Sequence, residues 1–165
     1  MFRCLKASFE QIDAIIDLRL ALLKEVGELH SSEEEQLLAA STREYLQHAL
    51  SNREFISYIA EIDGKPASIS GMALFKRPPY PENPQGLEAY ILNMYTLPEY
   101  RGKGLAGKLL ECCIEESKQS GVKRIWLHAT EAGEPLYAKM GFIKKNNEME
   151  KFLQEGSKES TPSIQ

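Results

Sequence analysis

Hydrophobic and polar residues in the first third of the 165-residue chain recur with a helical period after a short apolar segment. Residues 2–6 are predicted to form a strand. Ser8 stands three residues before Gln11, which is the spacing of a capping box at a helix N-terminus. The helical period continues to Gly27, where we expect the helix to end. Glutamates after Ser31 predict the first turn of a second helix, reaching about residue 50, because the helix dipole favours acidic residues there. The apolar faces expected for the two helices are Ile12, Ile15, Ile16, Leu20, Leu23 and Val26, and Leu37, Leu38, Tyr45, Leu46 and Ala49.

From residue 55 onward the pattern becomes typical of strands and turns. Residues 55–62 alternate between apolar and polar, and a second strand is expected over 65–75. Asp63-Gly64 between them is a pair that two-residue hairpin turns prefer. Residues 76–86 (KRPPYPENPQG) contain four prolines in eleven residues. This composition predicts a loop.

The last part of the chain predicts strands and helices in alternation. We expect strands over 88–96 and 124–128, a helix over 103–120 that ends at Gly121, a second helix ending at 140–141, and short strands around 142–144 and 148–153. The order β-α-α-β-β-β-α-β-α-β-β combines hairpins with a strand-helix-strand crossover, so the sheet should be mixed. We expect one domain over residues 1–154, followed by a disordered tail at 155–165 that is rich in Ser, Lys and Glu.

Composition narrows the class of protein. The net charge of −4, from 20 basic and 24 acidic residues, argues against a nucleic-acid partner held by phosphate contacts. No apolar run approaches the ~20 residues of a membrane span, and the N-terminus has no signal-peptide core. An odd number of cysteines, two of them adjacent, predicts reduced thiols and a cytoplasmic protein. Neither the cysteines nor the scattered histidines have metal-site spacing; these residues are Cys4, Cys112, Cys113, His30, His48 and His128.

The segment that says most about chemistry joins a predicted strand to a predicted helix. Gly102, Gly104 and Gly107 allow the backbone to approach a ligand closely. The N-terminus of the helix leaves N–H groups without intrahelical partners, and these donors bind phosphate oxygens. Arg101 and Lys103 add positive charge at the same place. The sequence therefore predicts a phosphate-binding loop.

Neighbouring residues distinguish three possible phosphate ligands. The run GKGLAG at 102–107 matches the dinucleotide fingerprint G-x-G-x-x-G, but a five-residue spacer separates it from the strand, and the next strand ends in His128 instead of an acidic residue. Residues 102–108 match the start of a Walker A loop, yet Leu109 stands where Ser or Thr would bind magnesium. The third ligand is an acyl-coenzyme A.

Two motifs resemble the GNAT superfamily of N-acetyltransferases. The run RGKGLA at 101–106 is similar to the family's Q/R-x-x-G-x-G/A pyrophosphate loop, with Ala106 where many members have glycine. The run LYAKMGF at 136–142 resembles the family's late helix-to-strand signature. The resemblance covers residues 2–153. It implies an α/β (α+β) fold with a mixed, mostly antiparallel central sheet of roughly six to seven strands and helices on both faces.

The resemblance also implies a site. Acetyl-coenzyme A is the expected co-substrate, and Tyr137 is the expected general acid that protonates the departing thiolate. No metal is implied. The acetyl carbonyl and pantetheine arm should pair with the backbone of the strand, and the pyrophosphate should bind the N–H groups of the loop. The residues implied for these contacts are Met94, Tyr95, Thr96, Arg101, Gly102, Lys103, Gly104, Leu105, Ala106 and Gly107.

Glu88 is the candidate general base, because the attacking amine must be neutral and other family members place a glutamate in this region of the strand. Alternation of strand side chains puts Glu88 on one face with Leu92 and Met94, and puts Asn93 on the opposite face, as a strand or a bulge residue. Acidic residues at 25–35 either attract a cationic amine or form a solvated helix face. The loop at 76–86 is expected to cover the acceptor side of the cleft.

The implied function is N-acetyl transfer from acetyl-coenzyme A to a primary amine of a small molecule or peptide, by direct attack in a ternary complex. A homodimer is compatible with this function, whereas nucleic acid and membrane partners are not expected. The alternative is a non-catalytic module on the same fold that binds or senses acyl-coenzyme A.

Overall fold

The structure, a computed structural model, describes residues 1–153. The chain divides into two compact units, Met1–Leu127 and His128–Gln165. A single domain over 1–154 stays a prediction, and the predicted tail at 155–165 lies outside the described residues.

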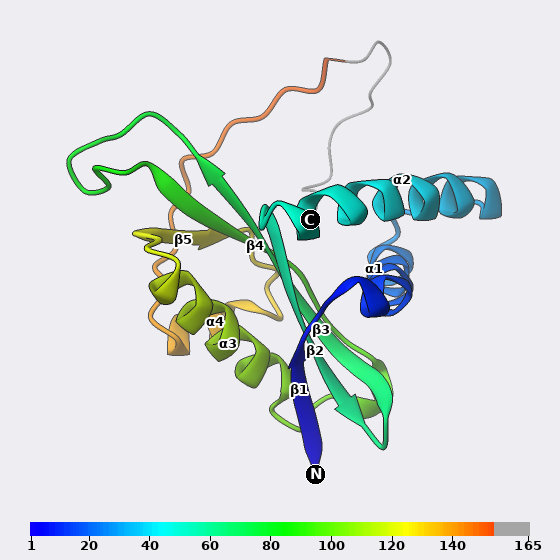
Figure 1. The fold of residues 1–165 in the computed structure, drawn as a ribbon. Coiled ribbons are helices and arrows are strands. Elements are labelled where there is room, and N and C mark those ends of the chain that lie inside the picture. The colour runs from blue at the N-terminus through cyan, green and yellow to red at the C-terminus, as the bar shows by residue number, and fades with distance from the viewer. Residues whose placement is uncertain (154–165) are drawn as a thin grey trace. The chain divides into compact units, whose positions relative to one another are not determined.

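The sheet of the first unit has five strands in the order β1-β2-β3-β4-β5 (Figure 1). Strands β1 to β4 pair antiparallel with their neighbours, and β4 and β5 pair parallel. The expected mixed, mostly antiparallel sheet is therefore confirmed. The strands are β1 (Phe2–Lys6), β2 (Phe55–Ile62), β3 (Lys65–Lys76), β4 (Leu87–Thr96) and β5 (Arg124–Leu127).

Each of the three helices of the first unit has one end at a residue that the sequence marks. Ser8 and Gln11 form the predicted capping box on a 3-10 turn, η1 (Phe9–Gln11), that continues into the first helix. The Ser31 hydroxyl accepts the N–H of Glu34 at the start of the second helix, and Gly121 follows the third with φ +77°. The helices are α1 (Ile12–Glu25), α2 (Ser32–Ser51) and α3 (Leu105–Gln119).

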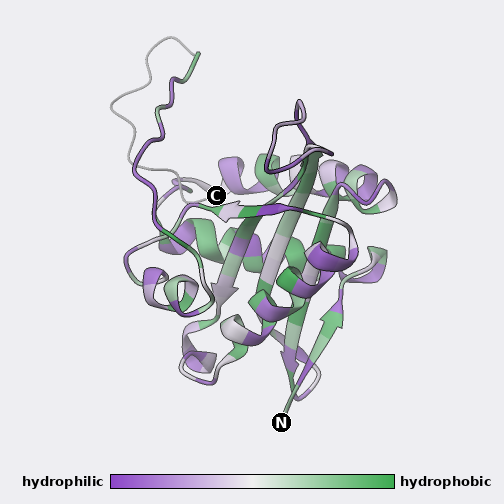
Figure 2. Cartoon of the chain, turned by 90° about the vertical axis from the view of Figure 1, so that its left-hand side faces the viewer, coloured by the Kyte–Doolittle hydropathy of each residue, from purple (hydrophilic) through white to green (hydrophobic). Residues whose placement is uncertain are grey.

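Helices cover both faces of the sheet. Ile59 packs in a cluster with residues of α1 and α2, whereas the next residue of β2, Ala60, packs with Leu105 and Leu109 of α3. Since successive strand residues point to opposite faces, α1 and α3 lie on opposite sides of the sheet. Figure 2 shows that these helices combine hydrophobic and hydrophilic sides.

The apolar face expected for α2 is only partly correct. Leu46 and Ala49 are buried, but Leu37 is 71% exposed and Tyr45 is 47% exposed. The buried residues of α2 lie in its last turns, next to β2. Leu37 lies in the first turns, so its apolar character does not lead to burial.

The described part of the second unit contains one short helix, α4 (Glu134–Lys139), and no strand. The helix has six residues and ends at Lys139, next to the expected end at 140–141. The strands predicted near 142–144 and 148–153 are wrong, and the sheet has five strands rather than six or seven. Ile143 and Met149 are both exposed, so these side chains gain no burial that would hold the segments in a ladder.

No helix within residues 1–153 has both the length and the apolar composition needed to cross a bilayer.

Candidate active site

A glycine-rich turn joins β4 to α3 through a 3-10 helix, η2 (Pro98–Tyr100). Gly102 and Gly104 have φ of +74° and +77°, in the left-handed region that side chains with a Cβ avoid. The sequence predicts α3 from residue 103, but the helix begins at Leu105 because the left-handed Gly104 is its N-cap. These two glycines let the chain turn from the end of β4 into the direction of α3.

The turn presents N–H groups to the solvent. Lys108 makes the first hydrogen bond within α3, from its N–H to the carbonyl of Gly104 at 3.1 Å. The N–H groups just before Lys108 therefore lie at the open end of the helix, where its dipole is positive. A Cβ on Gly102 or Gly104 would meet no heavy atom within 4 Å. The turn thus has the room and the donors that a diphosphate needs.

Arg101 does not extend toward this open space. Its Nη2 donates to both carboxylate oxygens of Glu25 at 2.7 Å, and its Nε donates to the carbonyl of Thr96 at 3.0 Å. Glu25 also accepts the hydroxyl of Tyr95 at 2.8 Å. The hydrogen bond from Arg101, followed by that from Tyr95, lowers the pKa of Glu25. Sequence reasoning placed Arg101 in the loop, but it missed both of these partners.

A bulge at Asn93 interrupts β4. Ile69 and Gly71 of β3 lie two residues apart, yet they oppose Tyr95 and Leu92, which lie three apart. Asn93 has φ +55°, and its Oδ1 accepts a hydrogen bond from Arg19 of α1. The bulge expected as one alternative for Asn93 is confirmed.

The bulge also changes which side chains share a face. Paired residues of neighbouring strands point the same way, so Leu92 and Tyr95 share one face, as their common cluster shows. The alternation that grouped Glu88 with Met94 ends at the bulge, and that grouping is wrong.

The strand β5 pairs with only part of β4. The ladder runs from Glu88↔Arg124 to Ile91↔Leu127, so residues 92–96 extend past the end of β5. On the other edge, the hydroxyl of Ser68 in β3 bonds the carbonyl of Tyr95 at 2.9 Å and lies 2.7 Å from the hydroxyl of Thr96. The segment 94–96 is therefore held by β3 on one edge, and its other edge is not paired with β5.

Glu88 lies at the other end of β4, and its side chain is fully buried. Its carboxylate accepts the Tyr80 hydroxyl at 2.7 Å, the Trp126 indole N–H at 3.1 Å, and Arg124 at 3.1 Å. Arg77 lies at 3.4 Å. Burial would raise the pKa of Glu88, but the hydrogen bond from Tyr80 and the two arginines outweigh it and lower the pKa. The group joins the loop at 76–86 to β4 and β5.

Tyr137 lies in α4, in the second unit. Its ring packs edge-to-face on Phe142 with 5.9 Å between centroids. The Tyr137 carbonyl accepts the N–H of Phe142 at 3.0 Å, and Gly141 between them has φ +89°. This turn explains why tyrosine, glycine and phenylalanine occur together in the LYAKMGF run: the glycine reverses the chain and brings the two rings together.

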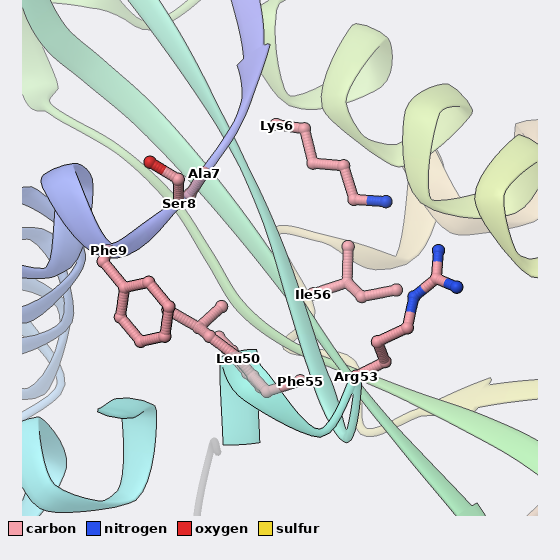
Figure 3. Close-up of a pocket in the computed structure, with 8 residues that line it drawn as sticks. All are labelled: Lys6, Ala7, Ser8, Phe9, Leu50, Arg53, Phe55 and Ile56. Atoms are coloured by element: carbon pink, nitrogen blue, oxygen red, sulfur yellow. The ribbon is translucent and has the colours of Figure 1, made fainter. Parts of the chain in front are cut away.

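One pocket of the first unit is lined by residues from the end of β1, the end of α2 and the start of β2. None of the predicted site residues lines it (Figure 3). Its Lys6 is paired with Glu116 at 2.7 Å. Its lining consists of Lys6, Ala7, Ser8, Phe9, Leu50, Arg53, Phe55 and Ile56. His, Cys, Asp and Glu side chains within residues 1–153 form no group of three that would suit a metal ion.

Comparison with known proteins shows the family. Residues 22–142 match the model of the acetyltransferase (GNAT) family. The chain is similar to a predicted acetyltransferase from Clostridium acetobutylicum, crystallised with acetyl-CoA, with 28% identity, a TM-score of 0.84 and coverage of 93% of this chain and 97% of that one. It is similar to a GCN5-related N-acetyltransferase from Ralstonia eutropha JMP134, with 28% identity, a TM-score of 0.81 and coverage of 93% and 99%.

A curated relative matches over a shorter stretch. It is a [ribosomal protein bS18]-alanine N-acetyltransferase of Haemophilus influenzae, 38% identical over 65 residues, which are 36% of this chain and 44% of the relative. The chain thus matches less than half the length of that relative. The family match, by contrast, includes the glycine turn, the β4–β5 junction and the LYAKMGF run. The chain belongs to the acetyltransferase (GNAT) family, whose acetyl donor is acetyl-coenzyme A.

Proposed function

We propose that this chain transfers the acetyl group of acetyl-coenzyme A to a primary amine, by direct attack within a ternary complex. The observation that carries the proposal is the turn at 101–107. Two left-handed glycines and the open end of α3 there present backbone N–H groups to an uncrowded space. Such donors suit the pyrophosphate of coenzyme A.

The β4 backbone beyond the end of β5 is the proposed site of the pantetheine arm and acetyl group. Residues 94–96 continue past the last β4–β5 pair, Ile91↔Leu127. An N–H in this segment that donates to the thioester oxygen stabilises the negative charge that develops there during attack. Because Ser68 fixes the Tyr95 carbonyl and the Thr96 hydroxyl, this backbone needs little reorganisation when the substrate binds.

In the proposed reaction the amine nitrogen attacks the thioester carbonyl carbon and forms the new C–N bond. The C–S bond then breaks, and coenzyme A leaves as a thiolate that takes a proton. We assign this proton to the hydroxyl of Tyr137, which acts as a general acid. The matching run at 136–142 supports this assignment, and it requires the Tyr137 hydroxyl to reach the sulfur in the ternary complex.

The attacking amine must also lose a proton, and the group that accepts this proton is a separate question. Glu88 stays a candidate from sequence, but four donors surround its buried carboxylate and its pKa is lowered. A carboxylate in such surroundings is a weak proton acceptor. We therefore favour loss of the amine proton to water, with Glu88 holding the loop at 76–86 against β4.

An activity assay tests the proposal. Free thiol released from acetyl-coenzyme A is measured with a panel of primary amines, including small amines, polyamines, amino acids and a peptide with an N-terminal alanine. The partial match to the alanine N-acetyltransferase supports including that peptide. We expect amine-dependent thiol release and an acetylated product by mass spectrometry. Binding of acetyl-coenzyme A without any amine-dependent release across the panel would favour the non-catalytic module.

A further inference from the structure

Glu25 is the last residue of α1, and its carboxylate contacts two residues that are distant in the sequence. Tyr95 donates its hydroxyl to Oε2 at 2.8 Å, and Arg101 donates to both oxygens at 2.7 Å. One contact comes from the end of β4 and the other from the first residue of the glycine turn. A single carboxylate thus joins α1 to both ends of the segment 95–101.

The Arg101 side chain makes a second link between the two ends of this segment. Its Nε donates to the Thr96 carbonyl at 3.0 Å, five residues back along the chain, and its guanidinium lies 5.7 Å from the centroid of the Tyr95 ring. Carboxylate, guanidinium and carbonyl therefore form one connected set of hydrogen bonds. The set fixes the path from β4 to Gly102 without using any N–H group of the turn.

The helix does not favour this glutamate by itself. An acidic residue at a helix C-terminus meets the negative end of the helix dipole. The hydrogen bonds from Arg101 and Tyr95 compensate, and they lower the pKa of Glu25, which favours its charged form. The contact also neutralises Arg101, the first residue of the turn. Its contribution is then to geometry more than to net charge.

We propose that Glu25 is a positioning residue for the donor site: through Tyr95 and Arg101 it holds the segment 95–101 in the shape that aims the N–H groups of the turn at the pyrophosphate. The inference rests on the proposed function, because it takes the turn as the coenzyme A site. It makes donor binding depend on a residue of α1, a helix on the opposite side of the sheet from α3.

Glu25→Gln tests this inference, because two physical effects predict opposite signs. If charge dominated, removing an anion near the turn and releasing Arg101 would strengthen binding of the anionic coenzyme A. If positioning dominates, the loosened segment weakens binding. The matched control is Glu99→Gln, which removes the same charge from an exposed residue of η2 and so measures the charge effect alone.

We expect calorimetry with coenzyme A to give a dissociation constant about tenfold higher for Glu25→Gln, about 1.4 kcal/mol, and an unchanged or lower one for Glu99→Gln. Tyr95→Phe, which removes only the hydroxyl donor, should shift binding in the same direction by a smaller factor. In turnover assays the KM for acetyl-coenzyme A should rise while kcat at saturation stays near that of the parent.

Tighter binding or a change within twofold for Glu25→Gln would overturn the inference, as would a lowered melting temperature with an unchanged dissociation constant. The Arg101→Ala background gives a further check, since Glu25→Gln should add little there if it acts through Arg101. The proposed function fails separately: if Gly104→Val binds coenzyme A normally, the turn is not the donor site. Weak binding by Gly104→Val with normal binding by Glu25→Gln rejects only the role of Glu25.

Discussion

Replacing Gly104 by valine perturbs the donor site at its most constrained backbone position. Gly104 has φ +77° and ψ +8°, and a Cβ there would meet no heavy atom within 4 Å. The free protein therefore suffers backbone strain but no clash. A left-handed conformation costs an ordinary residue about 1–2 kcal/mol, less than the ~5–15 kcal/mol of stability typical of a folded domain. The variant should fold.

Binding should suffer more than stability. The valine side chain would fill the space that the pyrophosphate must enter, and it would displace at least one N–H from a phosphate oxygen. A hydrogen bond to a charged group contributes about 1.5–3 kcal/mol, so the dissociation constant of coenzyme A should rise roughly 10- to 100-fold. Isothermal titration calorimetry measures this change directly.

Gly121→Val is the matched control. Gly121 has the same φ of +77°, its added Cβ would lie 3.9 Å from the nearest atom, an ordinary contact, and it follows the opposite end of α3. At ~1.5 Å per residue it lies about 25 Å from Gly104. Both variants should lose similar stability, but only Gly104→Val should lose affinity. Affinity within twofold of the parent for Gly104→Val, or equal losses in both variants, would refute the assignment of the turn.

Three further predictions follow from individual side chains. Tyr137→Phe should lower kcat by roughly 10²-fold, as for a lost general acid, with little change in the KM for acetyl-coenzyme A; unchanged kcat with a lower melting temperature would make Tyr137 structural. Glu88→Gln should lower stability by about 1.5–3 kcal/mol, because Tyr80, Trp126 and the half-exposed arginines lose a charged hydrogen-bond acceptor, while turnover of the folded protein keeps its pH profile; loss of the acidic limb of that profile would instead identify Glu88 as the base. Glu116 accepts hydrogen bonds from Lys6 and Tyr58, each at 2.7 Å, and although burial opposes them these bonds keep its pKa lowered. Its stabilisation is present above the unfolded-state pKa and is lost as pH falls through the folded-state pKa, so the melting-temperature difference between the parent and Glu116→Gln should shrink in acid, whereas a constant difference would contradict the pair.

Local rules predicted much of the fold. The capping box at Ser8, the Asp63-Gly64 turn and the helix end at Gly121 all depend on residues within a few positions of one another. The turn at Gly102 and Gly104 has the left-handed conformation for which only glycine is well suited. These signals are readable because the backbone conformation and the residue that permits it occupy the same place in the chain.

Other features depend on contacts that local patterns do not contain. Glu25 and Arg101 are 76 residues apart, and the sequence around each residue does not indicate that the two side chains pair. The sequence indicates that Glu88 carries a carboxylate, but it does not indicate the four side chains, from other segments, that donate to it. The prediction of strands after residue 141 was wrong for the same reason. A strand forms only where a neighbouring segment pairs with its backbone N–H and C=O groups.

A crystal structure of the chain with acetyl-coenzyme A tests the central claim most directly. The account predicts the pyrophosphate oxygens within hydrogen-bond distance of backbone N–H groups in residues 102–107, and the acetyl group beside residues 94–96 beyond the end of β5. A pyrophosphate bound elsewhere, with the N–H groups of the turn still facing solvent, would contradict it.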